Sequence, residues 1–272
     1  RAPRMPASIA SNLGETGIIT MSQPNILLIT TDQQRYDTIN VAGNPHILTP
    51  NLNWLCDSGR LFACLLKLGE SENTWIAFTS DHGELLGDHF LAAKFLALEA
   101  SAKIPFIIRA PGGDSEWAQL RGTCSDELVT LADLLPTFSE IGGIENIPAP
   151  IDGRDIRKLV AGESESRTGL RFQAAEFHGL LAGNWKYLLA SSTGDELLFN
   201  LTDDPLEQKN LIGQCPNDHK RLRARLLQLM EHSGLPSVKN GTLNPSGPPT
   251  FGNRRGDWPG HHSIEVPSDT LH

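Results

Sequence analysis

Two apolar runs in this chain each stop at an acidic residue that has a second metal-ligating side chain beside it. The run NILLITT precedes Asp32 and Gln33. The run NTWIAFTS precedes Asp81 and His82. Runs of this length and composition are typical of strands buried on both faces, and open α/β sheets place their ligands at the carboxyl ends of such strands. A hard divalent cation prefers carboxylate and amide oxygens, and an imidazole can add a nitrogen. The two runs together predict one metal site.

A simpler interpretation exists for each run taken alone. Asp is a common turn former, so two strands that end in ordinary turn residues would give the same pattern. In that interpretation Gln33 faces solvent and His82 caps the turn. The occurrence of both runs, with Gln and His alongside the acids, favours the metal site.

The surrounding sequence alternates between strand and helix patterns. Apolar runs predict strands, and a Pro near the start or a Gly pair at the end marks the predicted helices. This alternation predicts an α/β sandwich. The expected strands are residues 24–31, 74–80 and 104–109, and the expected helices are residues 50–62 and 131–141.

The character of the chain changes near residue 168. The strings FQAAEF, WKYLLA and ELLFNL predict three short strands, separated by turns at Gly179, Gly183 and Gly194, in a small antiparallel sheet. Residues 217–232 predict a basic amphipathic helix. A helix docked on its own domain is the expected use of such a pattern, with a membrane surface or a calmodulin-like partner as the alternative.

These patterns predict four parts of the chain. Met21 is the expected natural start, and the residues before it have no segment typical of a signal peptide. The tail is rich in Pro, Gly, Ser and Asn, a composition typical of disorder. The expected parts are an extension at 1–20, an α/β core at 21–165, an α+β subdomain at 166–235 and a disordered tail at 236–272.

Composition limits the partners of the chain. The net charge of −9 argues against nucleic acid, which needs a basic face, and is compatible with a cation site. No apolar run approaches the ~20 residues that span a bilayer, so no membrane association is expected. The four cysteines form no C-x-x-C pair, which favours free thiols in a reducing compartment and therefore a cytoplasmic location.

Larger blocks of the sequence resemble the type I sulfatase family of the alkaline-phosphatase superfamily. The motif SDHGELLGDH, followed by a Lys and then by IPFIIRAPG, carries most of this resemblance. It implies an alkaline-phosphatase-like α/β/α sandwich with a small C-terminal antiparallel sheet and helix. It also implies that Asp32, Gln33, Asp81 and His82 bind Ca²⁺ or a similar ion. The similar blocks are residues 24–37, 44–62, 73–112, 133–153 and 185–211.

Two cationic residues are candidates for binding the substrate. The resemblance implies that Lys94 contacts a sulfate ester, where a fixed cation would stabilise charge on the transferring group. The alternative is a solvated surface Lys. Arg35 is a second candidate anion contact, with a surface ion pair as its alternative. Glu84 and His89, which flank the motif, are expected to be structural or to support the ligands.

The family's nucleophile motif is missing from this sequence. Family members carry Cys or Ser, then x, Pro or Ala, x, Arg, and the first residue becomes formylglycine. Here the early block runs almost directly into the later one, which predicts an internal deletion near residues 63–66. Cys56 begins the nearest match, CDSGR, but Ser stands where Pro or Ala belongs. We interpret Cys56 as a residue of the early helix.

The leading functional hypothesis is a sulfuric ester hydrolase by descent, catalytically incompetent in this form. Aryl sulfate, choline sulfate and a sulfated sugar all remain open as substrates, and the oligomeric state is open too. Phosphomonoester or phosphonate-ester hydrolysis is a rival, because those esters need similar cation clamps. A non-catalytic metal-binding protein is a third hypothesis. Deletion of a central section of the chain, with its strands and their covering helices, also predicts a poorly soluble or partly molten chain.

Overall fold

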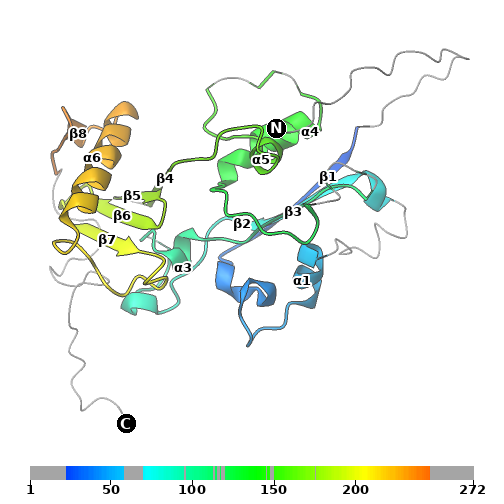
Figure 1. Ribbon diagram of the computed structural model, residues 1–272, viewed down its shortest axis with the longest axis horizontal. Helices are drawn as coiled ribbons and strands as arrows, with labels where there is room; N and C mark the ends of the chain where they lie inside the picture. The colour runs from blue at the N-terminus through cyan, green and yellow to red at the C-terminus, as the bar shows by residue number, and fades with distance from the viewer. Residues whose placement is uncertain are drawn as a thin grey trace, which may run out of the picture.

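The computed structural model divides into two sheets with their covering helices (Figure 1). The predicted extension at 1–20, the predicted deletion at 63–66 and most of the predicted tail lie outside the described residues. The structure describes residues 23–57 and 70–245, apart from residues 95, 113, 115, 116, 118, 119, 145, 148, 149 and 175.

The first sheet contains the three strands expected in the core. They are β1 (Asn25–Thr31), β2 (Thr74–Ser80) and β3 (Phe106–Arg109), in the order β1-β2-β3. β1 runs parallel to β2, with Thr31 opposite Ser80, and β3 runs antiparallel to β2. β1 and β2 therefore end at the same level, and the acids that follow them leave the sheet side by side. The predicted strands are confirmed, with small shifts at their ends. The expected burial on both faces holds for β2 but was wrong for β1, in which no residue is buried, because β1 pairs on one side only among the described strands.

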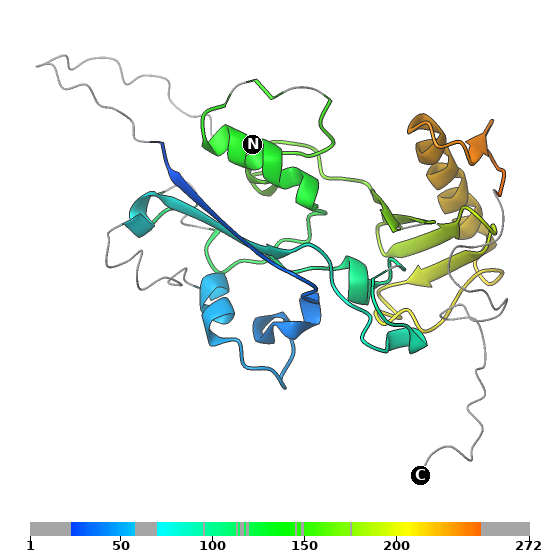
Figure 2. The same cartoon turned by 180° about the vertical axis from the view of Figure 1, so that it is seen from behind.

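Helices cover both faces of this sheet. Helix α1 (Pro50–Asp57) lies on one face, and α4 (Leu134–Ile141) and α5 (Ile156–Val160) lie on the other (Figures 1 and 2). Along β2, Ile76 and Phe78 belong to the core under α1, and Trp75 belongs to the core under α4. The alternation follows from the two-residue period of a strand. It explains why β2 is buried along its whole length.

The second sheet is antiparallel throughout. Its strands are β4 (Leu170–Ala174), β5 (Phe177–Ala182), β6 (Trp185–Ala190) and β7 (Glu196–Asn200), paired in that order. The predicted basic helix is α6 (Pro216–His232), and it packs on one face of this sheet through Leu222, Leu226 and Met230. The docked-helix interpretation is therefore confirmed. Among the described residues, no helix has the length and apolarity needed to cross a membrane.

The other face of the second sheet binds the loop that follows the SDHG motif. Leu85, Leu96 and Leu98 of this loop are buried against Leu188 and Phe199 of the sheet. Full burial of one leucine side chain stabilises the folded state by about 1.5–3 kcal/mol relative to leaving it exposed. The second sheet therefore fixes the position of the loop that carries Lys94.

Short elements complete the fold. Helix α3 (Glu99–Ala102) follows the loop, and the hairpin of β8 (Val238–Lys239) and β9 (Thr242–Leu243) follows α6. The 3-10 turns are Tyr36–Thr38, Asn40–Ala42, Glu70–Asn73, Asp88–Phe90 and Leu131–Asp133.

Two predictions about the C-terminal part were wrong. FQAAEF does not form one strand, because β4 ends at Ala174 and β5 begins at Phe177. Gly179 is not in a turn but lies inside β5, opposite Phe172 on β4. A side chain at Gly179 would collide with the ring of Phe172. Glycine at this position leaves room for the ring of Phe172 to lie against the backbone of β5, a known use of Gly in strands.

The tail was also predicted to be disordered from residue 236, yet β8 and β9 form a hairpin there. Its turn contains Asn240 and Gly241, both with positive φ (52° and 66°). This is the conformation that Asn-Gly favours in two-residue hairpin turns. The start of the hairpin is buried in the core beneath α6. The Asn-Gly pair was the signal that the compositional argument overlooked.

A buried ion cluster joins the second sheet to α3. The ammonium of Lys186 lies 2.9 Å from Oε1 of Glu99 and 2.9 Å from Oε1 of Glu207. The side chains of Lys186 and Glu207 are each only 1% exposed. Burial raises the pKa of Glu207, while Lys186 opposes that rise. Glu207 also accepts the backbone N–H of Glu99, so the cluster orients the start of α3.

β1 has an open side. Within the described strands it pairs with β2 alone, and Ile26 and Leu28 are 38% and 44% exposed. An unpaired strand edge with exposed apolar side chains is a template for association. This exposed edge fits the poor solubility expected from the sequence, which stays a prediction.

We predict that Lys186→Ala lowers the free energy of unfolding by about 3–5 kcal/mol, because it leaves Glu207 buried without its cation. Lys158→Ala is the matched control, since Lys158 pairs with Glu140 on the surface and exposed pairs contribute little. Urea unfolding of both variants measures the difference. Equal effects of the two substitutions would contradict a structural role for the buried cluster.

Candidate metal and anion site

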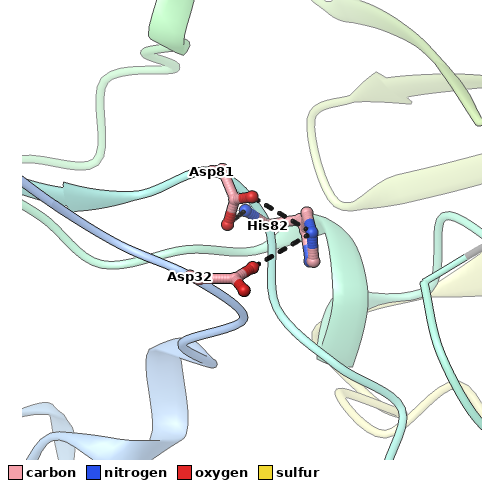
Figure 3. A group of neighbouring side chains, drawn as sticks. All are labelled: Asp32, Asp81 and His82. Carbon is pink, nitrogen blue, oxygen red and sulfur yellow. Dashed lines mark hydrogen bonds and ion pairs between the residues drawn. The ribbon is translucent and has the colours of Figure 1, made fainter.

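The acids that follow β1 and β2 meet in space. Asp32, Asp81 and His82 each offer a ligand atom, and these atoms all lie within 4.8 Å of one another (Figure 3). Nε2 of His82 is 3.2 Å from Oδ2 of Asp81 and 3.8 Å from Oδ1 of Asp32. This geometry arises because the parallel strands β1 and β2 end opposite each other, at Thr31 and Ser80. Three of the four predicted ligands are thus in one group.

The group faces solvent on its acidic side. The side chains of Asp32 and Asp81 are 77% and 46% exposed, whereas His82 is 19% exposed. A hydrated ion can therefore reach the carboxylates without any rearrangement of the core. Calcium, which accepts six to eight oxygen ligands at roughly 2.3–2.6 Å, tolerates water in the remaining positions.

The imidazole of His82 is oriented for ligation. Its Nδ1 lies 2.6 Å from the carbonyl oxygen of Gly83. A carbonyl oxygen can only accept, so Nδ1 carries a proton, and in the neutral ring Nε2 has a lone pair. That lone pair is on the side of the two carboxylates. A backbone acceptor on the other ring nitrogen is the usual way to fix a ligating histidine.

Backbone donors keep Asp81 ready to bind a cation. Burial raises the pKa of Asp81, but the N–H groups of Gln33 and His82, with the nearby charges of His82 and Lys94, outweigh it and hold the pKa below its usual range. Oδ1 accepts both N–H groups, at 3.1 Å from Gln33 and 2.7 Å from His82. The carboxylate is therefore ionised at neutral pH, and Oδ2 is turned toward the imidazole.

Gln33 contributes to the group through its backbone. It adopts a left-handed conformation with φ of 61°, which directs its N–H at Asp81. The side chain is exposed. Ligation by its amide oxygen stays a prediction.

Two small residues that the sequence analysis missed hold the site together. The hydroxyl of Ser80 accepts the N–H of Gln34 at 3.0 Å and lies within 3.0 Å of the carbonyl oxygen of Thr31. It thereby links the ends of both strands. Gly83 lies against α3, where a side chain would collide with the carbonyl of Ala100. In the sequence, the only indication of these two roles is that Ser80 and Gly83 belong to the SDHG motif.

Lys94 reaches the same group from the following loop. Its ammonium donates a hydrogen bond to Nε2 of His82. The loop before it contains four non-glycine residues with positive φ, which are Leu86, His89, Phe90 and Ala93. Backbone strain of this kind persists where surrounding structure enforces it and is concentrated at functional sites. Through its hydrogen bond to His82, Lys94, the predicted substrate contact, lies beside the predicted metal ligands.

The donor set fits a divalent cation. Two carboxylates and one imidazole lone pair converge, and the ammonium of Lys94 already places a positive charge against that lone pair. A metal ion and Lys94 would compete for Nε2, so binding of the ion would free the ammonium.

Arg35 is engaged within the protein. Its guanidinium pairs with Asp37 at 2.6 Å and Asp88 at 2.7 Å and donates to the carbonyl oxygens of Glu84 and Leu85. The hydrogen bond that Arg35 donates to Asp37 is the largest of the effects that raise the pKa of Arg35. These contacts favour the ion-pair alternative, in which Arg35 anchors the loop after the SDHG motif.

Comparison with known proteins shows a likeness to sulfatases. The family model described as Sulfatase matches residues 58–144. An arylsulfatase of Clostridium perfringens is 32% identical over 161 residues, which cover 57% of this chain and 32% of the relative. The chain belongs to the sulfatase family. It spans about a third of the length of the curated relatives that it matches, such as 32% and 34% for the first two.

Solved structures support the fold of this sulfatase-family chain. BT4656, solved in complex with its substrate D-glucosamine-2-N,6-O-disulfate, superimposes with a TM-score of 0.54 at 25% identity, covering 64% of this chain and 37% of that one. The phosphonate monoester hydrolase SpPMH from Silicibacter pomeroyi gives a TM-score of 0.53 at 25% identity, covering 64% and 38%. The predicted alkaline-phosphatase-like α/β fold is confirmed.

We predict that Ca²⁺ stabilises the chain and that Asp81→Ala abolishes the effect. A ligand at 100 times its Kd stabilises the folded state by about 2.7 kcal/mol. Asp152→Ala, an exposed acid outside the group, should keep the full response. Thermal unfolding with calcium and with EDTA measures it. Stabilisation that survives in Asp81→Ala would place the ion elsewhere.

Proposed function

We propose that this chain is the metal-binding and ester-binding part of a sulfuric ester hydrolase. In this proposal it binds a divalent cation, Ca²⁺ by preference, together with a sulfate ester, and does not complete hydrolysis. The observation that supports it is the meeting of Asp32, Asp81 and His82 with Lys94 in a sulfatase-family chain. Oxygen-rich ligation at an open site suits calcium better than a softer metal.

Asp32, Asp81 and His82 would hold the ion, with the amide of Gln33 as the proposed fourth ligand. When bound, the ion supplies positive charge that neutralises the oxygens of the ester. The two carboxylates balance that charge, so the site attracts a cation first and an anion second. His82 keeps its orientation through its bond to the carbonyl of Gly83.

Lys94 would bind the sulfate group. Once Nε2 of His82 is taken by the ion, the three N–H donors of Lys94 are free for sulfate oxygens. A fixed ammonium beside the ester also stabilises charge on the leaving oxygen. The loop packed on the second sheet holds this ammonium beside His82.

The proposal assigns no covalent nucleophile to this chain. Cys56 lies near the end of α1, and neither it nor Cys124 or Cys215 forms a disulfide among the described residues. None of the three begins a sequence that fits the formylglycine motif. Without an activated nucleophile, bound metal and Lys94 have no covalent step to assist. Formylglycine therefore belongs to the family, and we do not propose it for this chain.

The substrate class follows the relatives. One relative is an arylsulfatase and one solved structure is of a protein in complex with a sulfated glucosamine, so we propose a small sulfated ester or sulfated sugar. A phosphonate monoester is the second candidate, because SpPMH superimposes as well as the sulfatases do. Tetrahedral oxyanions of both kinds fit a clamp made of one metal and one ammonium.

We predict that an aryl sulfate such as p-nitrophenyl sulfate binds in the presence of Ca²⁺ and that Lys94→Ala weakens binding about tenfold or more. Loss of a charged hydrogen bond costs about 1.5–3 kcal/mol. Lys158→Ala is the control, because Lys158 lies on α5 away from the site. Isothermal titration with the sulfate and the matching phenyl phosphonate ranks the two ester classes. Unchanged affinity in Lys94→Ala would refute the proposed anion contact.

We also predict no sulfatase turnover by this chain, even when it is co-expressed with a formylglycine-generating enzyme. Peptide mass analysis should show Cys56 unconverted, and Cys56→Ala should behave as the unmodified chain does. The assay is release of p-nitrophenol from p-nitrophenyl sulfate. Metal-dependent release that disappears in Cys56→Ala would identify Cys56 as the nucleophile and reject the non-catalytic proposal.

A further inference from the structure

A second candidate binding site lies along the free edge of β3. A cavity of about 300 Å³ opens there, and this volume is at the lower end of the range typical of small-molecule sites. Its walls come from both layers around the first sheet, namely the segment before α1, α1 itself, β3 and α5. Apolar wall residues include Ile39, Leu55, Phe106, Ile108 and Trp117.

Arg109 gives this apolar cavity an unsatisfied polar group. Arg109 lines the cavity, and its Nε and Nη1 are shielded from solvent with no hydrogen-bond acceptor in the described structure. Buried N–H donors without acceptors are rare in native proteins and call for an explanation. Burial lowers the pKa of Arg109, Arg121 lowers it further, and Glu72 opposes both. An added anion would satisfy the guanidinium.

Arg121 adds a second guanidinium to the same cavity. It donates to the carbonyl oxygens of Pro111 at 3.1 Å and Gly112 at 2.8 Å, which fixes its orientation. The acid among the lining residues is Glu127. Oε1 of Glu127 accepts the hydroxyl of Ser166 at 2.7 Å, so that oxygen is directed at Ser166.

This cavity is separate from the metal group. Arg109 pairs with Ile76 across the sheet, and Asp81 lies five residues farther along the chain. A strand rises about 3.3 Å per residue, so roughly 16 Å separate the two positions. A sulfate held by Lys94 does not reach Arg109 over that distance. The two sites can therefore be tested independently.

We propose that the cavity along β3 binds a small organic oxyanion, with a carboxylate or sulfate against Arg109 and an aryl or short alkyl body against the apolar walls. Guanidinium groups recognise such oxyanions with paired hydrogen bonds. Apolar walls with a few oriented polar groups are the general pattern of small-molecule sites. Nothing in this proposal depends on the metal or on the proposed ester binding.

The test compares 4-phenylbutyrate with 4-phenylbutanol on the full chain, because the two probes share a body and differ in charge. We expect the acid to bind at least tenfold more tightly than the alcohol by isothermal titration. Arg109→Gln should remove this preference, and Arg121→Gln should weaken it a few-fold. Arg225→Gln is the matched control, since Arg225 contacts Thr168 outside the cavity. Asp81→Ala should bind the acid normally.

Equal affinity for the acid and the alcohol would overturn the proposal, and so would the absence of binding at millimolar concentration. This comparison uses the unmodified chain, so it does not depend on the folding of any variant. Retained preference in a folded Arg109→Gln variant would also overturn it. Loss of acid binding in Asp81→Ala would assign the effect to the metal group and reject a separate site.

Discussion

The parallel pairing of β1 with β2 is the constraint on which the candidate site depends. The register runs without interruption from Asn25 opposite Thr74 to Thr31 opposite Ser80. Because both strands end at the same level, Asp32 and Asp81 emerge side by side. A change of register by two residues would move one carboxylate about 6–7 Å along the sheet, and the ligand group would be lost. The buried length of β2 holds the register, since a shift would expose its alternating apolar side chains.

The second sheet has a different part in the same site. Its face opposite α6 buries Leu85, Leu96 and Leu98, and the loop between those anchors carries Lys94. The cluster of Lys186 with its two glutamates joins this sheet to α3. The first sheet thus supplies the metal ligands, and the second positions the cation that would bind the ester. Anion binding by Lys94 therefore depends on the packing of the loop after the SDHG motif on the second sheet.

Sequence patterns predicted the parts of the fold that depend on local periodicity. The strands of the core, the helix at 131–141 and the docked α6 were found from apolar spacing and from Pro and Gly signals. The candidate metal ligands were predicted because acids follow two apolar runs of strand length, of which β2 is buried throughout and β1 is not. Long-range contacts were not readable in the same way. Arg35 meets Asp88 across 53 residues of sequence, and Gly179 is needed by the ring of Phe172 on the neighbouring strand. Such pairs become visible only when the chain has folded.

The central claim is that Asp32, Asp81 and His82 form one divalent-cation site, and a crystal structure of the chain grown with Ca²⁺ tests it most directly. The account predicts an ion within about 2.3–2.6 Å of carboxylate oxygens from both acids. It also predicts that the ammonium of Lys94 has left Nε2 of His82. A crystal at saturating calcium in which these three side chains hold no ion, with Lys94 still bonded to His82, would contradict the account.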